Sequence, residues 1–359
     1  MDALHGMVEQ AAALERAAEW EPARDAWARA FTAARAGRNP RAMADATRGA
    51  ARTLRELGQL DDAEEQAELS REIAVRCGLP LETARAVNIL GTIRHVAGAI
   101  HEAADMYESA LEGARACRDD ELIGLACVNL GVVANIRGEL NTAFTYYLES
   151  IAAAVRTGSV QSSLRGYNNL GMLAADVREW MQADVLFHRA LELAEQVDDT
   201  TVVPTLLLNR AEPLIHVGEL DLAEEVLDRA EAMAERIQNV RDLAEAARFR
   251  GMLQRRRGDD AGAAQQLGRS LLLATRAGLR LERAEALEQL ALLHYDAGRL
   301  EDARTHLSEA CAEFFAAGAS RDCLRLRELS SAWSAEEAET ADADEAPATV
   351  PALKIASAA

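Results

Sequence analysis

An alanine returns along this chain at a constant step of 40 residues, and this period constrains the fold more than any other feature. The series comprises Ala23, Ala63, Ala103, Ala143, Ala183, Ala223, Ala263 and Ala303. The residue seven places after each alanine is small, and these residues are Ala30, Ser70, Ala110, Ser150, Ala190, Ala230, Ser270 and Ala310. A period of roughly 20 to 50 residues is typical of arrays that stack one supersecondary unit many times. We therefore expect about eight stacked units.

Further columns of the repeat predict what each unit contains. The residue four places after each alanine is bulky in seven units of the eight, and the set is Trp27, Ala67, Tyr107, Tyr147, Phe187, Leu227, Leu267 and Leu307. Residues at these offsets share one face of a helix. A glycine at 58, 98, 138, 218, 258 and 298 precedes that helix, and Ala18 and Arg178 take its place in two units. Since glycine tolerates a turn after a helix, we predict two antiparallel helices per unit.

The composition agrees with an all-α fold and excludes several functions. Only 4% of the 359 residues are aromatic, and there are 7 prolines. The formal net charge of -20 argues against binding to nucleic acid, which requires a positive field. No run of about 18 apolar residues occurs, so we expect no membrane insertion. The opening MDALHGMVEQ lacks the pattern of a signal peptide, and the cysteines (Cys77, Cys117, Cys127, Cys311, Cys323) are scattered. Both observations favour a cytoplasmic location.

This repeat resembles the tetratricopeptide repeat family, whose unit is a pair of antiparallel helices. The family signature is a large residue, Leu-Gly, a turn glycine, an alanine, a large residue and a second alanine. One unit here shows Leu170, Gly171, Ala183, Phe187 and Ala190 at those places. The resemblance covers roughly residues 3 to 319 and implies a right-handed α-solenoid superhelix. The family unit is about 34 residues long, so a unit of 40 predicts helices longer by about three residues each.

The repeat also predicts the organisation of the chain. We expect the solenoid over residues 1–319 as one cooperative array, because each unit buries its apolar face only against its neighbours. The segment SRDCLRLRELSSAW predicts a helix over 320–334 that caps the last unit. Residues 335–359 contain six acids, one lysine and two prolines. That composition predicts a disordered acidic tail.

A row of asparagines is the first candidate for a binding site. In the family, the first helix of each unit lines the concave groove. The column nine places before the turn glycine holds Asn129, Asn169 and Asn209 in consecutive units, and Asn88, Asn135 and Asn168 lie close by. Amide side chains donate and accept hydrogen bonds, so such a row could hold an extended peptide backbone. Alternatively, each asparagine bonds the adjacent repeat. The sequence leaves both readings open.

A group of arginines is the second candidate. Arg48, Arg52 and Arg55 share one helix face, and Arg85 of the next unit could join them. Arginine binds carboxylates with a two-pronged fork, so the group could select an acidic segment of a partner or the acidic tail of the chain itself. The alternative is a solvated face balanced by acids such as Asp45 and Glu56.

A carboxylate clamp known from some members of the family was also compared with the sequence. Its best frame here is Asn88, Thr92, Asn129, Arg165 and Asn169. This frame lacks the basic residue that the clamp requires at Asn88 and again at Asn169. The resemblance therefore does not favour that mode of binding.

No catalytic, cofactor or metal motif is present. The seven histidines are scattered without an HExxH pattern, and neither a phosphate-binding glycine loop nor GxSxG occurs. We therefore expect a non-catalytic scaffold or adaptor that binds a protein or peptide, with no catalytic, cofactor-binding or metal residues. A self-associating array and a peptide-responsive sensor remain alternatives. Lys354 is the only lysine beside many arginines, which indicates a GC-rich bacterial source.

Overall fold

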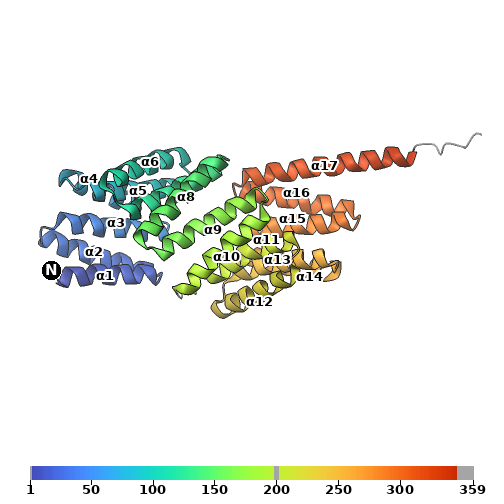
Figure 1. Cartoon of the computed structure of the whole chain (residues 1–359), viewed down its shortest axis with the longest axis horizontal. Helices are drawn as coiled ribbons and strands as arrows, with labels where there is room; N and C mark the ends of the chain where they lie inside the picture. Colours follow the sequence, from blue (N-terminus) through green and yellow to red (C-terminus); the bar gives the residue numbers. More distant parts are fainter. Residues whose placement is uncertain (1, 198–201, 346–359) are drawn as a thin grey trace, which may run out of the picture. The chain divides into compact units, whose positions relative to one another are not determined.

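The computed structural model describes residues 2–197 and 202–345, and within these ranges the chain forms helices and no strand (Figure 1). The helices are α1 (Asp2–Arg16), α2 (Trp20–Ala36), α3 (Pro40–Glu56), α4 (Leu60–Arg76), α5 (Pro80–Val96), α6 (Ile100–Cys117), α7 (Asp120–Ile136), α8 (Leu140–Thr157), α9 (Val160–Asp176), α10 (Trp180–Gln196), α11 (Val203–Val217), α12 (Leu220–Ile237), α13 (Val240–Arg257), α14 (Asp260–Ala277), α15 (Arg280–Asp296), α16 (Leu300–Ala316) and α17 (Ser320–Glu345). The predicted all-α class is confirmed. None of these helices, over the part described, is both long and apolar enough to span a bilayer.

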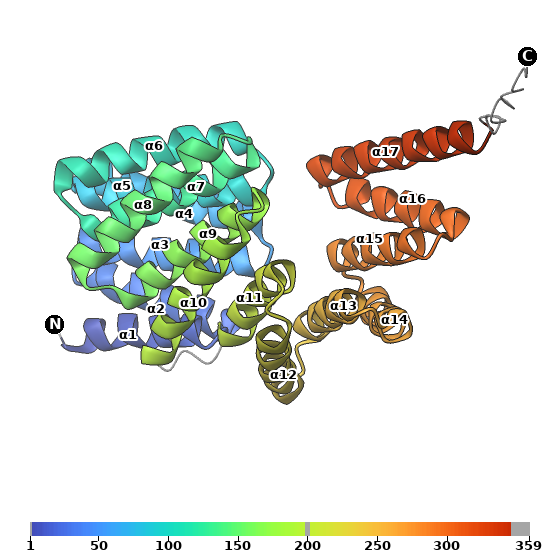
Figure 2. The ribbon, with the colours of Figure 1, turned by 45° about the vertical axis from the view of Figure 1, so that its right-hand side comes forward.

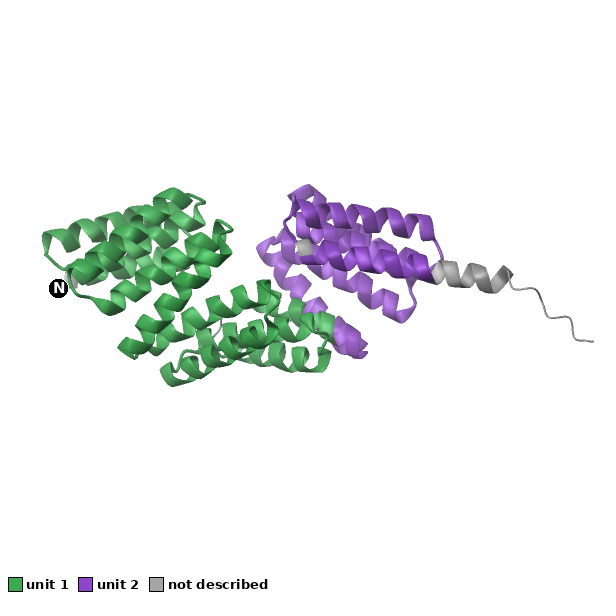
Figure 3. Cartoon of the chain, turned by 90° about the horizontal axis from the view of Figure 1, so that it is seen from above, with its two compact units in different colours: residues 1–213 green, residues 214–359 purple. Residues whose placement is uncertain are grey.

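The chain divides into two compact units, residues 1–213 and residues 214–359 (Figure 3). In unit 1, α3 packs on α4, α5 on α6, α7 on α8 and α9 on α10, and each of α1, α3, α5 and α7 also contacts the next odd-numbered helix. In unit 2, α13 packs on α14 and α15 on α16, and α17 covers α16 (Figure 2). The helix pairs of a tetratricopeptide-like solenoid are therefore present in both units. A single continuous array over residues 1–319 stays a prediction.

The division falls inside α11 at Pro213. Proline has no N–H to donate and its ring crowds the preceding turn of a helix. Helix α11 nevertheless continues through Pro213 to Val217. The repeat columns give no sign of the division, because they register only which helix faces are apolar.

The 40-residue columns are the core of the fold. All eight alanines of the first series, from Ala23 to Ala303, have no exposed surface. The bulky column packs against them, with Tyr107 and Phe187 at most 2% exposed. A Cβ atom placed on Gly91 would lie 2.8 Å from the Tyr107 ring, and one on Gly171 would lie 2.6 Å from the Phe187 ring. Each glycine thus makes room for the ring of its own helix pair.

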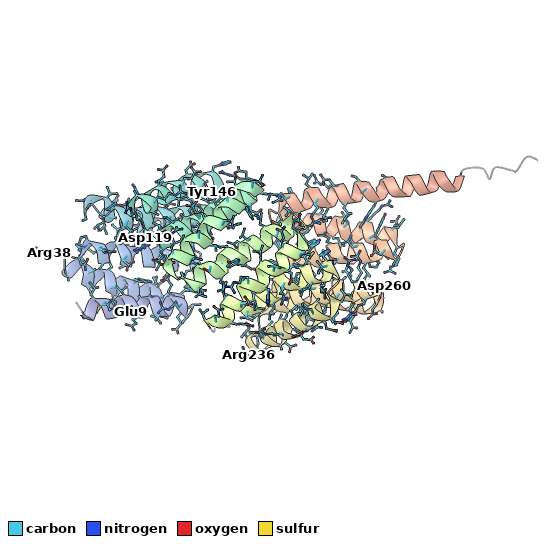
Figure 4. All side chains as sticks on the ribbon, in the orientation of Figure 1. Glu9, Arg38, Asp119, Tyr146, Arg236 and Asp260 are labelled. Carbon is cyan, nitrogen blue, oxygen red and sulfur yellow. A yellow bond between two sulfur atoms is a disulfide. The ribbon has the colours of Figure 1, made fainter. Side chains whose placement is uncertain are left out.

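The turns occupy two series of left-handed residues. The predicted glycines join the two helices of a unit with positive φ, as Gly58 does at 74°, and Arg178 adopts the same conformation at 62°. The sequence analysis did not identify a second series, which joins one unit to the next and includes Gly78, Gly158, Gly278 and Gly318. Several helices that follow these turns begin at a capping side chain. Asp119, labelled in Figure 4, accepts a hydrogen bond of 2.8 Å from the Leu122 amide.

The C-terminal region differs from the prediction in two ways. Helix α17 continues beyond Ser334 to Glu345, so the first part of the predicted acidic tail is helical. Residues 346–359, the remainder of that tail, lie outside the described residues. In addition, Cys311 and Cys323 are not scattered, because α16 and α17 bring them together as a disulfide with 4.9 Å between the Cα atoms. Their separation of 12 residues gave no CxxC spacing by which to recognise the pair.

Candidate functional site

The first helices of four consecutive units enclose a cleft of about 500 Å³ in unit 1, here called the inner cleft. Its lining comprises Arg48, Arg52, Arg55, Arg85, Asn88, Ile89, Thr92, Glu121, Leu122, Leu125, Asn129 and Arg165. All of these residues belong to α3, α5, α7 or α9. Six of the ten residues that the sequence singled out therefore meet in one place. Asn135, Asn168, Asn169 and Asn209 are not part of this lining.

Ion pairs hold the four N-terminal arginines of the inner cleft. Arg52 uses Nε and Nη2 to donate to both carboxylate oxygens of Glu15, at 2.6 and 3.0 Å. Arg55 donates to Glu56 with the same two nitrogens. Arg85 donates to Asp119 at 3.1 Å, and Arg48 donates to Asp45. The sequence analysis named Asp45 and Glu56 as acids that could balance this face, and both form ion pairs with its arginines.

Glu82 is the centre of this charged network. Its side chain is 3% exposed, and it accepts a hydrogen bond of 2.7 Å from Arg48 and one of 3.1 Å from Arg41. Arg85 lies 3.6 Å from the same carboxylate. Burial by itself raises the pKa of Glu82, but the hydrogen bond and charge of Arg48, with the charges of Arg85 and Arg41, outweigh burial and lower the pKa below its ordinary value. The carboxylate is therefore ionised and fixes the positions of Arg48 and Arg85.

The asparagines make hydrogen bonds between adjacent repeats. Asn129 donates from Nδ2 to Oδ1 of Asn88 at 3.1 Å, and Asn209 donates in the same way to Asn168 at 2.9 Å. Each bond spans 41 positions, one more than the period. Asn135 donates to Asp176 at 3.1 Å. These bonds are what the structural alternative predicts, and they also fix the amide orientation that a peptide would meet.

Asn169 stands apart from the other members of its row. It is half-buried on α9, and its side chain makes no hydrogen bond among the described residues. An amide has two donors and an acceptor with two lone pairs. Asn169 thus keeps its full hydrogen-bonding capacity on the face where the first helices meet.

Arg165 also lines the cleft, although the sequence pointed to it only as part of the clamp frame and not as a member of the arginine group. It lies 80 positions after Arg85, which is two repeats, and Leu125 occupies the same column between them. All three line the inner cleft. The signal that could have grouped Arg165 with Arg85 is therefore its column in the repeat, since equivalent residues of successive first helices share one face. Ile89, Leu122 and Leu125 add an apolar part to the cleft that the sequence analysis also did not identify.

The described residues hold no group of three or more histidine, cysteine, aspartate or glutamate side chains placed to bind a metal. His294 and His306 do stack in unit 2, with 5.0 Å between ring centroids. Parallel stacked rings direct their nitrogens sideways and not toward a common point. This pair therefore gives no ligand set of its own.

The chain matches no family model and no curated protein. It is similar in structure to the apo quorum sensor NprR from B. thuringiensis, with a TM-score of 0.64, 15% identity and 87% of each chain covered. It is also similar to a Rap protein complexed with Competence and Sporulation Factor, with a TM-score of 0.60, 11% identity, and 92% of this chain and 99% of that chain covered. A tetratricopeptide repeat protein from Parabacteroides merdae gives a TM-score of 0.54 and 18% identity, with 79% and 98% covered.

At these identities the similarity establishes the fold alone. The class that this fold defines is the all-α solenoid of tetratricopeptide-like helix pairs, as the repeat columns predict.

Proposed function

We propose that this chain is a non-catalytic regulator or adaptor that binds an extended peptide segment of a partner in its inner cleft. The observation that carries the proposal is the mixed lining of that cleft, in which amides, guanidinium groups and leucine side chains converge from four first helices. Clefts that bind ligands commonly combine an apolar lining with a few placed polar groups. Two of the similar structures support this reading, since one is described as a quorum sensor and the other is a complex with Competence and Sporulation Factor.

The segment is proposed to run from the inner cleft along the asparagine column, where Asn129 of the cleft and Asn169 and Asn209 of the next two units hold its backbone. Asn88 and Asn168 orient Asn129 and Asn209, and Asn135, which donates to Asp176, is proposed as a further contact. Two members of the row already have a fixed orientation through hydrogen bonds to the preceding unit. Preorganised groups bind with a smaller loss of side-chain entropy. Asn169, which makes no such bond, would contribute the adaptable contact.

The arginines are proposed to act at two levels. Arg48 and Arg85 are held by the buried Glu82 and would shape the wall of the cleft. Arg52 and Arg55 bind their acids through Nε and Nη2, and Nη1 takes part in neither bond. These two could therefore donate to an acidic partner without leaving their present pairs. Binding of such a segment in a bacterial cytoplasm completes the proposal.

The experiment is a pull-down from lysate with wild type and with the triple variant Asn129→Ala, Asn169→Ala and Asn209→Ala, followed by mass spectrometry. Asn141→Ala is the matched control, because Asn141 is an exposed asparagine on α8 and outside the cleft. We expect a partner that wild type and the control retain and the triple variant loses. A partner that all three proteins retain equally would contradict the proposed site.

A peptide-responsive sensor is the second candidate, favoured by the similarity to a quorum sensor. Small-angle scattering with and without the captured peptide separates the two. A change in radius of gyration on binding would favour the sensor, and an unchanged profile would favour the adaptor. Sedimentation of the free chain tests the self-associating alternative.

A further inference from the structure

Arg165 differs from the other four arginines of the inner cleft because it has no acidic partner. Arg48, Arg52, Arg55 and Arg85 each form at least one ion pair. Over the described part of the chain, the exposed side chain of Arg165 makes neither a hydrogen bond nor an ion pair. A guanidinium group carries five N–H donors and stays charged. Arg165 is therefore where the cleft has an unused capacity for a carboxylate.

The charge balance of the cleft limits how many carboxylates it can accept. Five arginines line it, and they face six acids, which are the lining residue Glu121 and the partners Glu15, Asp45, Glu56, Glu82 and Asp119. A segment with several acids would meet these carboxylates at close range, and like charges at close range repel. One carboxylate at Arg165 meets a cation that no acid among the described residues neutralises. The balance thus favours a single acid over an acidic run.

Apolar side chains adjoin this position. Leu125 occupies the same repeat column as Arg165, one unit earlier, and it is 38% exposed. Leu122 and Ile89 line the same cleft and are 3% and 6% exposed. An apolar ligand side chain that covers the exposed part of Leu125 would remove apolar surface of the ligand and of Leu125 from water. This burial contributes about 25 cal/mol of favourable free energy per Å². A ligand residue next to the carboxylate should therefore be apolar.

From these observations we infer that the inner cleft recognises one carboxylate beside an apolar side chain, and that Arg165 binds the carboxylate. This inference rests on the proposed peptide-binding function and adds the chemistry of the peptide. The carboxylate can come from an aspartate or glutamate side chain or from a free C-terminus. Arg48 and Arg85 act on the wall of the cleft and do not select the acid.

The probe is an array of immobilised heptapeptides. Three sets have both ends blocked and differ in the central residue, which is Asp, Asn or Lys. Each of these sets is made in two versions, with Leu or with Ser after the central residue. A fourth set has no acidic side chain and ends in a free carboxylate after Leu. All other positions are mixtures of Ala, Ser and Gln. Blocked ends ensure that each of the first three sets presents only the charge of its central residue.

Three labelled proteins are applied to the array. They are wild type, Arg165→Glu and the matched control Arg29→Glu, since Arg29 is an exposed arginine on α2, outside the cleft and likewise without an ion pair among the described residues. The triple asparagine variant gives the background. Because Arg165 makes no ion pair, its variant should melt at the wild-type temperature, which a thermal scan checks.

We expect wild type to retain the Asp–Leu set, the free-carboxylate set, or both, about fivefold more than the Asn–Leu set. Fivefold corresponds to about 1 kcal/mol, the upper range for a partly exposed ion pair. Arg165→Glu should lose this preference and favour the Lys–Leu set, whereas Arg29→Glu should behave as wild type. The stronger of the two acidic sets identifies the source of the carboxylate.

Two results would overturn the inference, and they are distinguishable. If peptides bind above background but the Asp, Asn and free-carboxylate sets bind equally, the role of Arg165 is wrong and the peptide-binding function stands. If no set binds above the triple asparagine variant, the proposed function fails and this inference fails with it. Preference for Asp that survives Arg165→Glu would also contradict the assignment.

Discussion

Replacing Glu82 by glutamine should destabilise unit 1 more than any other single loss of charge around the inner cleft. The Glu82 side chain is 3% exposed and that of Arg48 is 9% exposed. Removing one partner of a buried ion pair costs about 3–5 kcal/mol, because the remaining charge stays buried. Arg48 keeps its pair with Asp45, so we expect the lower end, about 3 kcal/mol. For a unit of 213 residues, that loss lowers the melting temperature by roughly 6–12 °C.

The effect should depend on pH in a defined direction. The pKa of Glu82 in the folded chain lies below its ordinary value of 4.5. A carboxylate with a lowered folded pKa contributes stability that is complete above the unfolded pKa and lost as pH falls through the folded value. The gap between wild type and Glu82→Gln should therefore be full at pH 7 and narrow as pH falls below about 4.5.

Thermal scans by circular dichroism across this pH range measure the gap, and hydrogen exchange locates it in α3 and α5. Glu121→Gln is the matched control, since Glu121 is 78% exposed and lies 3.6 Å from Arg85. An exposed pair of this kind contributes at most about 1 kcal/mol. The reasoning is refuted if Glu82→Gln costs no more than Glu121→Gln, or if its cost stays constant down to pH 3.5.

Three further predictions concern the core, the turns and the thiols. Ala183 has no exposed surface, so Ala183→Leu should overpack a helix interface and lower the free energy of unfolding by about 1–3 kcal/mol, as measured by urea unfolding. The control Ala152→Leu, at an exposed site on the adjacent helix pair, should change that free energy little. Arg178→Gly should stabilise unit 1 by up to about 1 kcal/mol in the same assay, because φ is 62° there and glycine adopts that conformation without strain; a destabilised variant would contradict this. Burial raises the pKa of the Cys127 thiol to about 12, and Cys77 is exposed. Iodoacetamide at pH 8 should therefore label Cys77 and spare Cys127 in peptide mass spectra, and equal labelling of the two in the folded chain would show that Cys127 is accessible.

The fold could be predicted from the sequence because the same pattern of buried residues recurs in eight units. Ala143 alone would not predict a buried position, but an alanine recurs in that column in every unit and is buried in each. Gly171 and Phe187 both match the family signature, and the Phe187 ring lies 2.6 Å from where a Cβ on that glycine would be. The second series of turns was missed because Arg38, Arg118 and Gln238 replace glycine in it. All three adopt positive φ, which cannot be recognised from the residue type.

The candidate site was predictable only in part. Helical spacing placed Arg48, Arg52 and Arg55 on one face, and all three line the inner cleft. Their acidic partners could not be found in the same way, since Glu82 and Glu15 lie 34 and 37 positions away on other helices. Pairing at that range depends on how far one unit is displaced against the next, which a helical pattern does not specify.

The hydrogen bonds of the asparagine row join adjacent units, and this has a consequence for how such a chain can change length. The hydrogen bonds Asn129–Asn88 and Asn209–Asn168 each reach 41 positions, so each joins one unit to the unit before it. Removing 40 consecutive residues would therefore rejoin equivalent surfaces, whereas removing one residue inside a helix would turn the rest of that helix's columns away from the core. We therefore expect insertions and deletions to be tolerated best in whole multiples of the period, so that the surface available to a ligand grows or shrinks by complete helix pairs.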